Sequence, residues 1–304
     1  VTTPILKFVS ELVNNKPRRI HFDYPSANGL VLFREVSVLM VAYGTKLLSL
    51  PDEADNYTLK YKGIWISLEI ITRALLGGYV IFGVFEVYGD TSLVDALNIG
   101  LKMALSIPVE DALAFPKITK PYFEFLEAIF RKNLIFFFSQ DRNTFFRIFV
   151  CLEAGIKSLE KSILSKCAVT VANMASFHFS NTIMEESPSL PAARCLSQHI
   201  VDLPALFPQM LKTLFEVFLF NETDSPWSLS KAMLSVILVL SEETCMNVKS
   251  MILASQAADK LQRFSPCFDD LMKDINRSLD PNNVDRFSQN LSRFKKEFKS
   301  IYQG

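Results

Sequence analysis

The chain has 304 residues, of which 49% are hydrophobic and 21% charged, so it can bury a sizeable core and is not a disordered chain. Its 32 Lys and Arg residues balance its 32 Asp and Glu residues, which argues against a general affinity for nucleic acid or anionic lipid. Five cysteines that form no C-x-x-C pair argue against a disulfide framework or zinc site and favour a reducing compartment, the cytosol or nucleus.

The first residues predict a helix that is already under way. They do not combine a charged start with a clean apolar run, as a signal peptide does, and the sequence lacks an initiating Met. We therefore expect a fragment of a longer protein. Gly and Pro number only 10 and 14, which argues against a β-barrel or β-sandwich and favours long helices.

Turn-forming segments divide the chain into helical blocks, within which apolar residues recur every three or four positions. Between residues 122 and 138 the pattern inverts: Glu124, Glu127 and Arg131 form a narrow polar line on an otherwise apolar helix, which is typical of an inner helix. This alternation predicts stacked hairpins of roughly 40–60 residues, at or above the length of a HEAT or armadillo repeat. We expect an all-α, HEAT-like helical-hairpin solenoid, with residues 1–304 forming a single continuous array of about six to seven hairpins.

Three segments need separate interpretation. Residues 64–87 are the best candidate for a membrane span, but Glu69, Arg73 and Glu86 interrupt them, so we expect buried helices and no membrane insertion. Residues 79–90 are rich in β-branched and aromatic side chains, yet a lone strand would have no partner. We expect an apolar connection with a short helix there, and a flexible linker at residues 183–192.

The last helix gives the clearest pattern in the chain. Its apolar residues are spaced three or four apart, and the positions between them from 285 to 300 are polar: Val284, Phe287, Leu291, Phe294, Phe298 and Ile301. The polar side is basic on balance. We interpret residues 280–304 as a C-terminal capping helix. Two alternatives are a basic patch that meets an acidic partner and a helix on a membrane surface.

No pattern in the sequence indicates catalysis. The three histidines, His21, His178 and His199, have no second His or Cys at helical ligand spacing, and we expect His178 to be a satisfied core or groove residue. There is no phosphate-binding loop and no G-x-S-x-G motif. We therefore predict no enzyme activity, no metal and no cofactor, and a surface that binds other proteins.

Several segments together resemble a known family. They are GLVLFREVSVLMVAYG at 29–44, YVIFGVFEVYGD at 79–90, LSIPVEDALAFPKI at 105–118, WSLSKAMLSVILV at 227–239 and DRFSQNLSRFKKEF at 285–298. In this order they resemble the C-terminal third of the exportin-7 family, also called Ran-binding proteins 16 and 17, in the importin-β superfamily. The resemblance extends over essentially the whole chain and includes no catalytic signature.

The resemblance implies part of a nuclear transport receptor, an exportin that shuttles between nucleus and cytoplasm. Such a receptor carries protein cargo through the nuclear pore with Ran-GTP and meets nucleoporins. The main Ran contacts of this superfamily lie in N-terminal repeats that this chain lacks. From charge and expected exposure, we predict protein contacts at residues of the terminal motif: Arg286, Asn290, Arg293, Lys295 and Lys296. The alternative function is a generic HEAT-repeat scaffold for protein–protein interaction.

Overall fold

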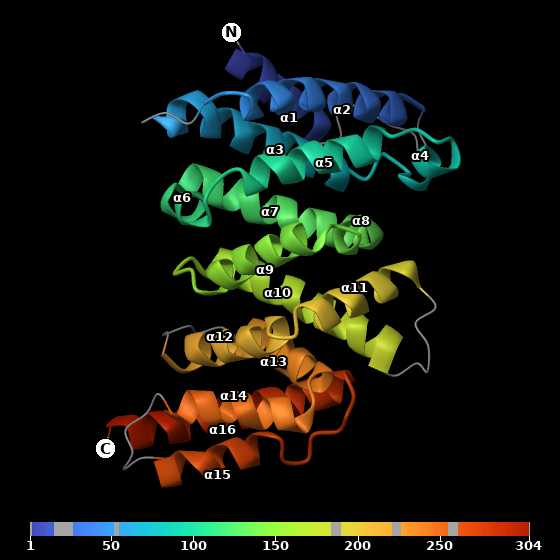
Figure 1. Cartoon of the computed structure of the whole chain (residues 1–304). Helices are drawn as coiled ribbons and strands as arrows, with labels where there is room; N and C mark the ends of the chain where they lie inside the picture. The colour runs from blue at the N-terminus through green and yellow to red at the C-terminus, as the bar shows by residue number, and fades with distance from the viewer. Residues whose placement is uncertain are drawn as a thin grey trace. The chain divides into compact units, whose positions relative to one another are not determined.

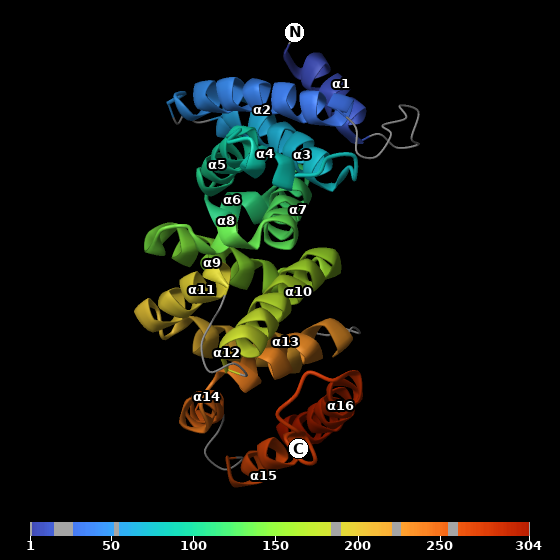
Figure 2. The same ribbon diagram turned by 90° about the vertical axis from the view of Figure 1, so that its right-hand side faces the viewer.

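The structure is a computed structural model that describes residues 2–14, 27–51, 55–183, 190–220, 226–254 and 261–303. Within these ranges the regular elements are helices, and there is no strand (Figures 1 and 2). The chain divides into two compact units, Val1–Phe137 and Phe138–Gly304, and the division falls inside the short helix α8 (Leu134–Phe138). The predicted all-α fold of stacked helical hairpins is confirmed.

The first unit stacks its helices in two layers. In one layer, α1 packs on α3 and α3 on α7; in the other, α2 packs on α5, and both also contact α3 (Figure 1). Its helical elements are α1 (Thr2–Asn14), α2 (Ala27–Leu48), the π-helical turn η1 (Tyr57–Tyr61), α3 (Lys62–Leu76), α4 (Gly83–Val87), α5 (Ser92–Leu105), α6 (Val109–Ala114) and α7 (Pro116–Lys132). The expected inner helix is α7, whose residues from Tyr122 to Phe130 are buried except for half-buried Glu124 and Glu127. It ends at Lys132, just after exposed Arg131, and residues 134–138 form the separate helix α8, so the expectation of one helix as far as residue 138 is wrong.

Helix α3 occupies most of the segment that resembled a membrane span. Ten of its fifteen residues are buried by neighbouring helices. Arg73 of this helix pairs with Glu69 of the same helix at 2.9 Å and with Glu11 of α1 at 2.6 Å, so the second pair joins α3 to α1. In the described part of the chain no helix alone has the length and apolarity of a membrane span, although α11 (Pro191–Asp202) and α12 (Leu206–Phe220) do so as a pair bent by 82°.

The connection at residues 79–90 contains the short helix α4, as the sequence predicts. Tyr79 is 4% exposed, and its hydroxyl donates a hydrogen bond of 3.0 Å to the carbonyl oxygen of Val13. Gly29 of α2 makes room for this approach, because a Cβ there would lie 2.4 Å from the Tyr79 carbonyl oxygen. Tyr79 therefore contacts both α1 and α2.

The second unit repeats the two-layer arrangement. Helices α10, α13 and α16 pack in succession in one layer, and α9, α12, α14 and α15 follow one another in the other. Its elements are α9 (Arg142–Ile156), α10 (Lys161–His178), the π-helical turn η2 (Phe179–Ile183), α11 (Pro191–Asp202), α12 (Leu206–Phe220), α13 (Pro226–Val239), α14 (Glu242–Ala254), α15 (Leu261–Leu271) and α16 (Pro281–Gln303). Most of the expected linker, residues 184–189, lies outside the described residues.

Hydrogen bonds between side chains join neighbouring helices within each layer of this unit. Ser176 of α10 hydrogen-bonds Ser235 of α13 (3.1 Å between the Oγ atoms), and Ser230 of α13 hydrogen-bonds Ser288 of α16 (2.7 Å). In the other layer, one carboxylate oxygen of Glu153 accepts hydrogen bonds from Lys157, Thr213 and Gln209. Burial alone would raise the pKa of Glu153, but these bonds outweigh it and lower the pKa.

The buried histidines only partly match expectation. His178 is buried as predicted, but its Nδ1 atom has no hydrogen-bond partner among the residues that the structure describes, so the expectation of a satisfied side chain is wrong at that atom. Burial lowers its pKa because the surroundings disfavour the charged ring. His199 stacks on Phe145 with ring centroids 4.1 Å apart, and its Nε2 lies 2.9 Å from the Phe138 carbonyl oxygen.

Candidate interaction surface

Helix α16 has the two faces that the sequence predicts. The apolar stripe packs inward, with Phe287, Leu291, Phe294 and Phe298 each no more than 2% exposed. Four aromatic rings of α15 and α16 contact one another there, the closest pair being Phe264 and Phe298 with centroids 4.2 Å apart. The buried stripe therefore fixes which side of α16 faces solvent.

The solvent-facing side carries most of the predicted contact residues. Arg286, Arg293 and Lys296 are exposed, and Lys299 extends the same basic side. Lys295 is half-buried, with its Nζ 4.8 Å from the centre of the Phe218 ring of α12. Its charge therefore stabilises the packing of α16 on α12 as well as lying near the surface.

Asn290 does not belong to this exposed set. It is 8% exposed, and its Nδ2 donates to the carbonyl oxygens of Leu271 (3.1 Å) and Lys273 (2.9 Å). Arg286 also bonds inward, donating from Nη1 to the Asp274 carbonyl oxygen at 3.0 Å. Both side chains hold the segment that connects α15 to α16, residues 272–280, which we call the α15–α16 loop.

A third residue of α16, missed in the sequence, completes this attachment. Asn283 accepts from the Asn276 amide (2.9 Å) and donates to the carbonyl oxygens of Asn276 (2.8 Å) and Ser278 (2.7 Å). Its side-chain amide thus satisfies three backbone groups of a loop that has no partner helix or strand for them. Asp274, in the same loop, adopts a φ of 58°, which a non-glycine residue rarely does. The side chains of α16 therefore set the loop's conformation.

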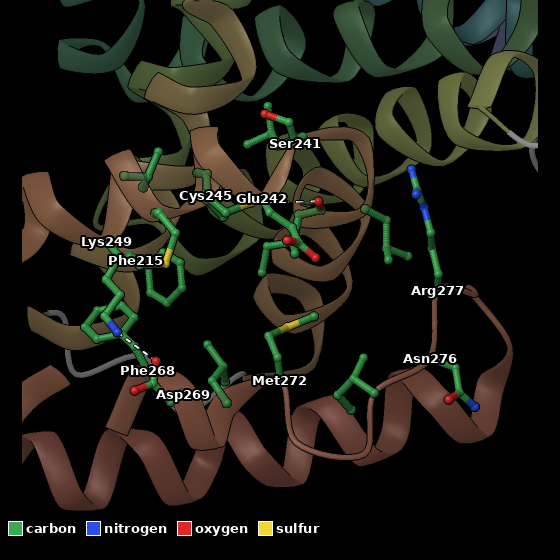
Figure 3. Close-up of a pocket in the computed structure, with 18 residues that line it drawn as sticks. Phe215, Ser241, Glu242, Cys245, Lys249, Phe268, Asp269, Met272, Asn276 and Arg277 are labelled. Carbon is green, nitrogen blue, oxygen red and sulfur yellow. Dashed lines mark hydrogen bonds and ion pairs between the residues drawn. The ribbon is translucent and has the colours of Figure 1, made fainter. Parts of the chain in front are cut away.

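The α15–α16 loop forms one wall of a groove in the second unit. The groove has a volume of about 760 Å³ and lies between the loop, α15, the middle of α12, the C-terminal end of α13 and the first two turns of α14 (Figure 3). Phe215, Val248 and Leu271 give it an apolar floor and are themselves buried. At one end Lys249 of α14 pairs with Asp269 of α15, with 2.8 Å between Nζ and Oδ1.

The groove is lined by one cysteine, Cys245, whose thiol could act as a nucleophile. Burial raises the pKa of this thiol, and the neighbouring Glu242 carboxylate raises it further, so the thiolate nucleophile is disfavoured. In the described ranges, no three His, Cys, Asp or Glu side chains gather as metal ligands would.

Comparison with known proteins matches the sequence prediction. No family model matches the chain. Over 97% of its length the chain is 35% identical to exportin-7-B of Xenopus laevis and 31% identical to Ran-binding protein 17 of Homo sapiens. It is 31% identical to Ran-binding protein 16 of Drosophila melanogaster over 99% of its length. The chain is a homologue of the exportin-7 and Ran-binding protein 16 and 17 family. The predicted family relationship is confirmed.

Homology covers this chain but only part of its relatives. The chain spans about 28% of the length of each of these three proteins. Two of the segments that carried the sequence resemblance, 227–239 and 285–298, lie in α13 and α16, which pack on each other. The resemblance in these segments therefore includes many core positions, such as Met233 and Phe294.

Proposed function

We propose that this chain is part of a nuclear transport receptor, an exportin that carries protein cargo out through the nuclear pore with Ran-GTP. The observation that carries the proposal is the match to exportin-7 and the Ran-binding proteins along nearly the whole chain. The helical-hairpin fold is suited to the role, because stacked hairpins expose long surfaces to macromolecular partners. The proposal includes shuttling between nucleus and cytoplasm, contact with nucleoporins and no enzymatic step.

Ran binding and cargo export test this proposal in a longer protein that contains this chain. The expected result is capture of Ran locked in its GTP form, no capture of the GDP form, and movement of a bound client protein out of nuclei. A protein that captures neither Ran-GTP nor any client that leaves the nucleus would contradict it. A generic helical scaffold, the second candidate, predicts client binding that does not depend on the nucleotide of Ran.

We propose that the basic side of α16 contacts a protein partner of that receptor. Arg293 and Lys296 are exposed and lie three residues apart on one face, and Arg286 and Lys295 extend the charge along the helix. Asn290, being buried, acts through the loop that it holds. Such a basic surface favours an acidic partner surface and faster association with it.

Reversing the charge of exposed residues on this surface tests whether it contacts a partner. In the longer protein, Arg293→Glu combined with Lys296→Glu is expected to weaken client or Ran-GTP binding about tenfold or more, and more at low than at high salt. Lys46→Glu, at an exposed position of α2, is the matched control and leaves binding unchanged. Equal binding by the double variant and the control would exclude the α16 surface as a contact.

We also propose that the hairpins of the two units belong to one continuous array, with residues 280–304 as its cap. The support is that the division between the units falls within a helix, α8, and not in a loop. Small-angle X-ray scattering distinguishes the two cases. A single array gives one rigid particle, whereas two units joined flexibly give scattering that requires an ensemble of arrangements.

A further inference from the structure

The groove beside α14 has the size and lining of a binding site. Its volume of about 760 Å³ falls within the range of about 300–1,000 Å³ that is common for ligand pockets. The lining combines buried apolar side chains, among them Phe215, Val248 and Leu271, with polar ones such as Glu242 and Arg277, which Figure 3 labels. This arrangement favours an occupant with a continuous apolar side.

Two opposite charges stand on different walls of the groove. Glu242 extends from the first turn of α14 and Arg277 from the α15–α16 loop (Figure 3). Both side chains are exposed, and within the described ranges neither forms an ion pair or hydrogen bond. Lys249 and Asp269, which also line the groove, neutralise each other. The groove therefore offers one free negative and one free positive charge.

The walls favour a helical occupant over an extended one. The main-chain groups of α14 and α15 are largely used in their own helices, so the walls offer few partners for the backbone of an extended peptide. A helix satisfies its own backbone groups and presents only side chains. An amphipathic helix laid in an apolar groove is a common mode of protein recognition.

One wall is adaptable and the other is held in place. Met246 of α14 and Met272 of the α15–α16 loop line the groove and are 56% and 37% exposed, and methionine side chains rearrange readily around an apolar partner. The loop backbone, by contrast, is fixed by the amide of Asn283. The groove can thus accept side chains of different shape without losing its walls.

We propose that this groove binds an amphipathic helix of a partner protein, with an acidic residue placed against Arg277 and a basic residue against Glu242. The apolar side of that helix covers Phe215, Val248 and Leu271. The proposal does not depend on Ran or on transport, since it concerns the chain alone. It distinguishes the occupant by charge: a helix that carries one acidic and one basic residue at these two positions binds better than a helix that carries two charges of the same sign.

Three synthetic peptides of about 15 residues, stapled to be helical, test the proposal. They share one apolar side and differ at the two positions meant to face Arg277 and Glu242. These two residues are one acidic and one basic (the mixed probe), both acidic, or both basic. The chain is labelled with ¹³C at the methionine methyl groups, and binding is followed by NMR. The expected result is that signals of Met246 and Met272 shift, while those of buried Met103 and Met174 do not.

Wild-type protein is expected to bind the mixed probe about two- to fivefold more tightly than the other two, as exposed charge pairs allow. Arg277→Glu moves the preference to the basic probe, and Glu242→Lys moves it to the acidic probe. Glu243→Lys is the matched control, because Glu243 is exposed and adjacent to Glu242 but does not line the groove. It leaves the order of the probes unchanged.

Three results would overturn the proposal. The first is no shift of the Met246 and Met272 signals at probe concentrations up to about 1 mM, which corresponds to a binding free energy of little use in recognition. The second is equal affinity for all three probes. The third is tighter binding of an uncharged, proline-containing peptide with the same apolar content, which would show an extended occupant instead. None of these results bears on Ran binding by the longer protein.

Discussion

Replacing Asn283 by Ala should loosen the α15–α16 loop and destabilise the second unit. The change removes three hydrogen bonds of 2.9, 2.8 and 2.7 Å between a side chain that is 7% exposed and the loop backbone. Each such bond contributes a net 0.5–1.5 kcal/mol, roughly. Because water can reach part of the loop, we expect a loss of about 2–3 kcal/mol in the free energy of unfolding.

Hydrogen exchange measured by mass spectrometry checks this loss of stability in the α15–α16 loop itself. A loss of about 2–3 kcal/mol corresponds to roughly 30- to 150-fold faster exchange when opening limits protection, and the increase should appear in the loop and in α16. Asn282→Ala is the matched control: Asn282 is the exposed neighbour on the same turn, and its replacement should cost less than about 0.5 kcal/mol. If the two variants exchange alike, Asn283 does not hold the loop.

Three further predictions concern the cores of the two units. Gly100→Ala places a methyl group 2.4 Å from Cζ of Phe125, so overpacking should outweigh the gain in helix propensity and destabilise the first unit by about 1–2 kcal/mol in urea unfolding. Glu153→Gln should cost about 1 kcal/mol at neutral pH, and because the folded-state pKa of Glu153 is lowered, the difference from wild type should vanish as the pH falls below its folded pKa. The lowered pKa of His178 means that only the unfolded chain binds its proton near pH 6.5, so stability should decrease as the pH falls below that value, and less so in His178→Leu; equal pH slopes would contradict this.

The sequence predicted those parts of the fold that depend on periodic burial. In α16 the spacing of Phe287, Leu291, Phe294 and Phe298 identified the buried side, because an amphipathic helix has only one way to hide such a stripe. The inner position of α7 followed from the same reasoning. These features need no knowledge of distant residues.

The candidate site was harder to predict because its polar residues act on backbone groups far along the chain. Asn290 looked like an exposed polar residue, yet its partners are carbonyl oxygens of Leu271 and Lys273. The sequence did contain one indication that these residues are buried: Asn283 lies four residues before Phe287 and Asn290 three residues after it, so both flank the buried stripe. The groove itself left no sequence pattern, because its wall is an irregular loop whose path depends on those two amides.

The structural period was also hidden in the sequence. Hydrogen bonds between neighbouring helices of the same layer in the second unit join residues 58, 59 and 60 positions apart: Ser230 with Ser288, Ser176 with Ser235, and Glu153 with Thr213. Packing requires only apolar residues of suitable size at the contact positions, so the hairpins can repeat in structure without a shared sequence.

The layered order of α10, α13 and α16 has a mechanical consequence. Because α13 lies between the other two and hydrogen-bonds to each through Ser235 and Ser230, the three helices are linked in series. Tension applied to the C-terminal end would then detach one hairpin at a time. Each detachment would release about 58 residues, or roughly 200 Å of extended chain.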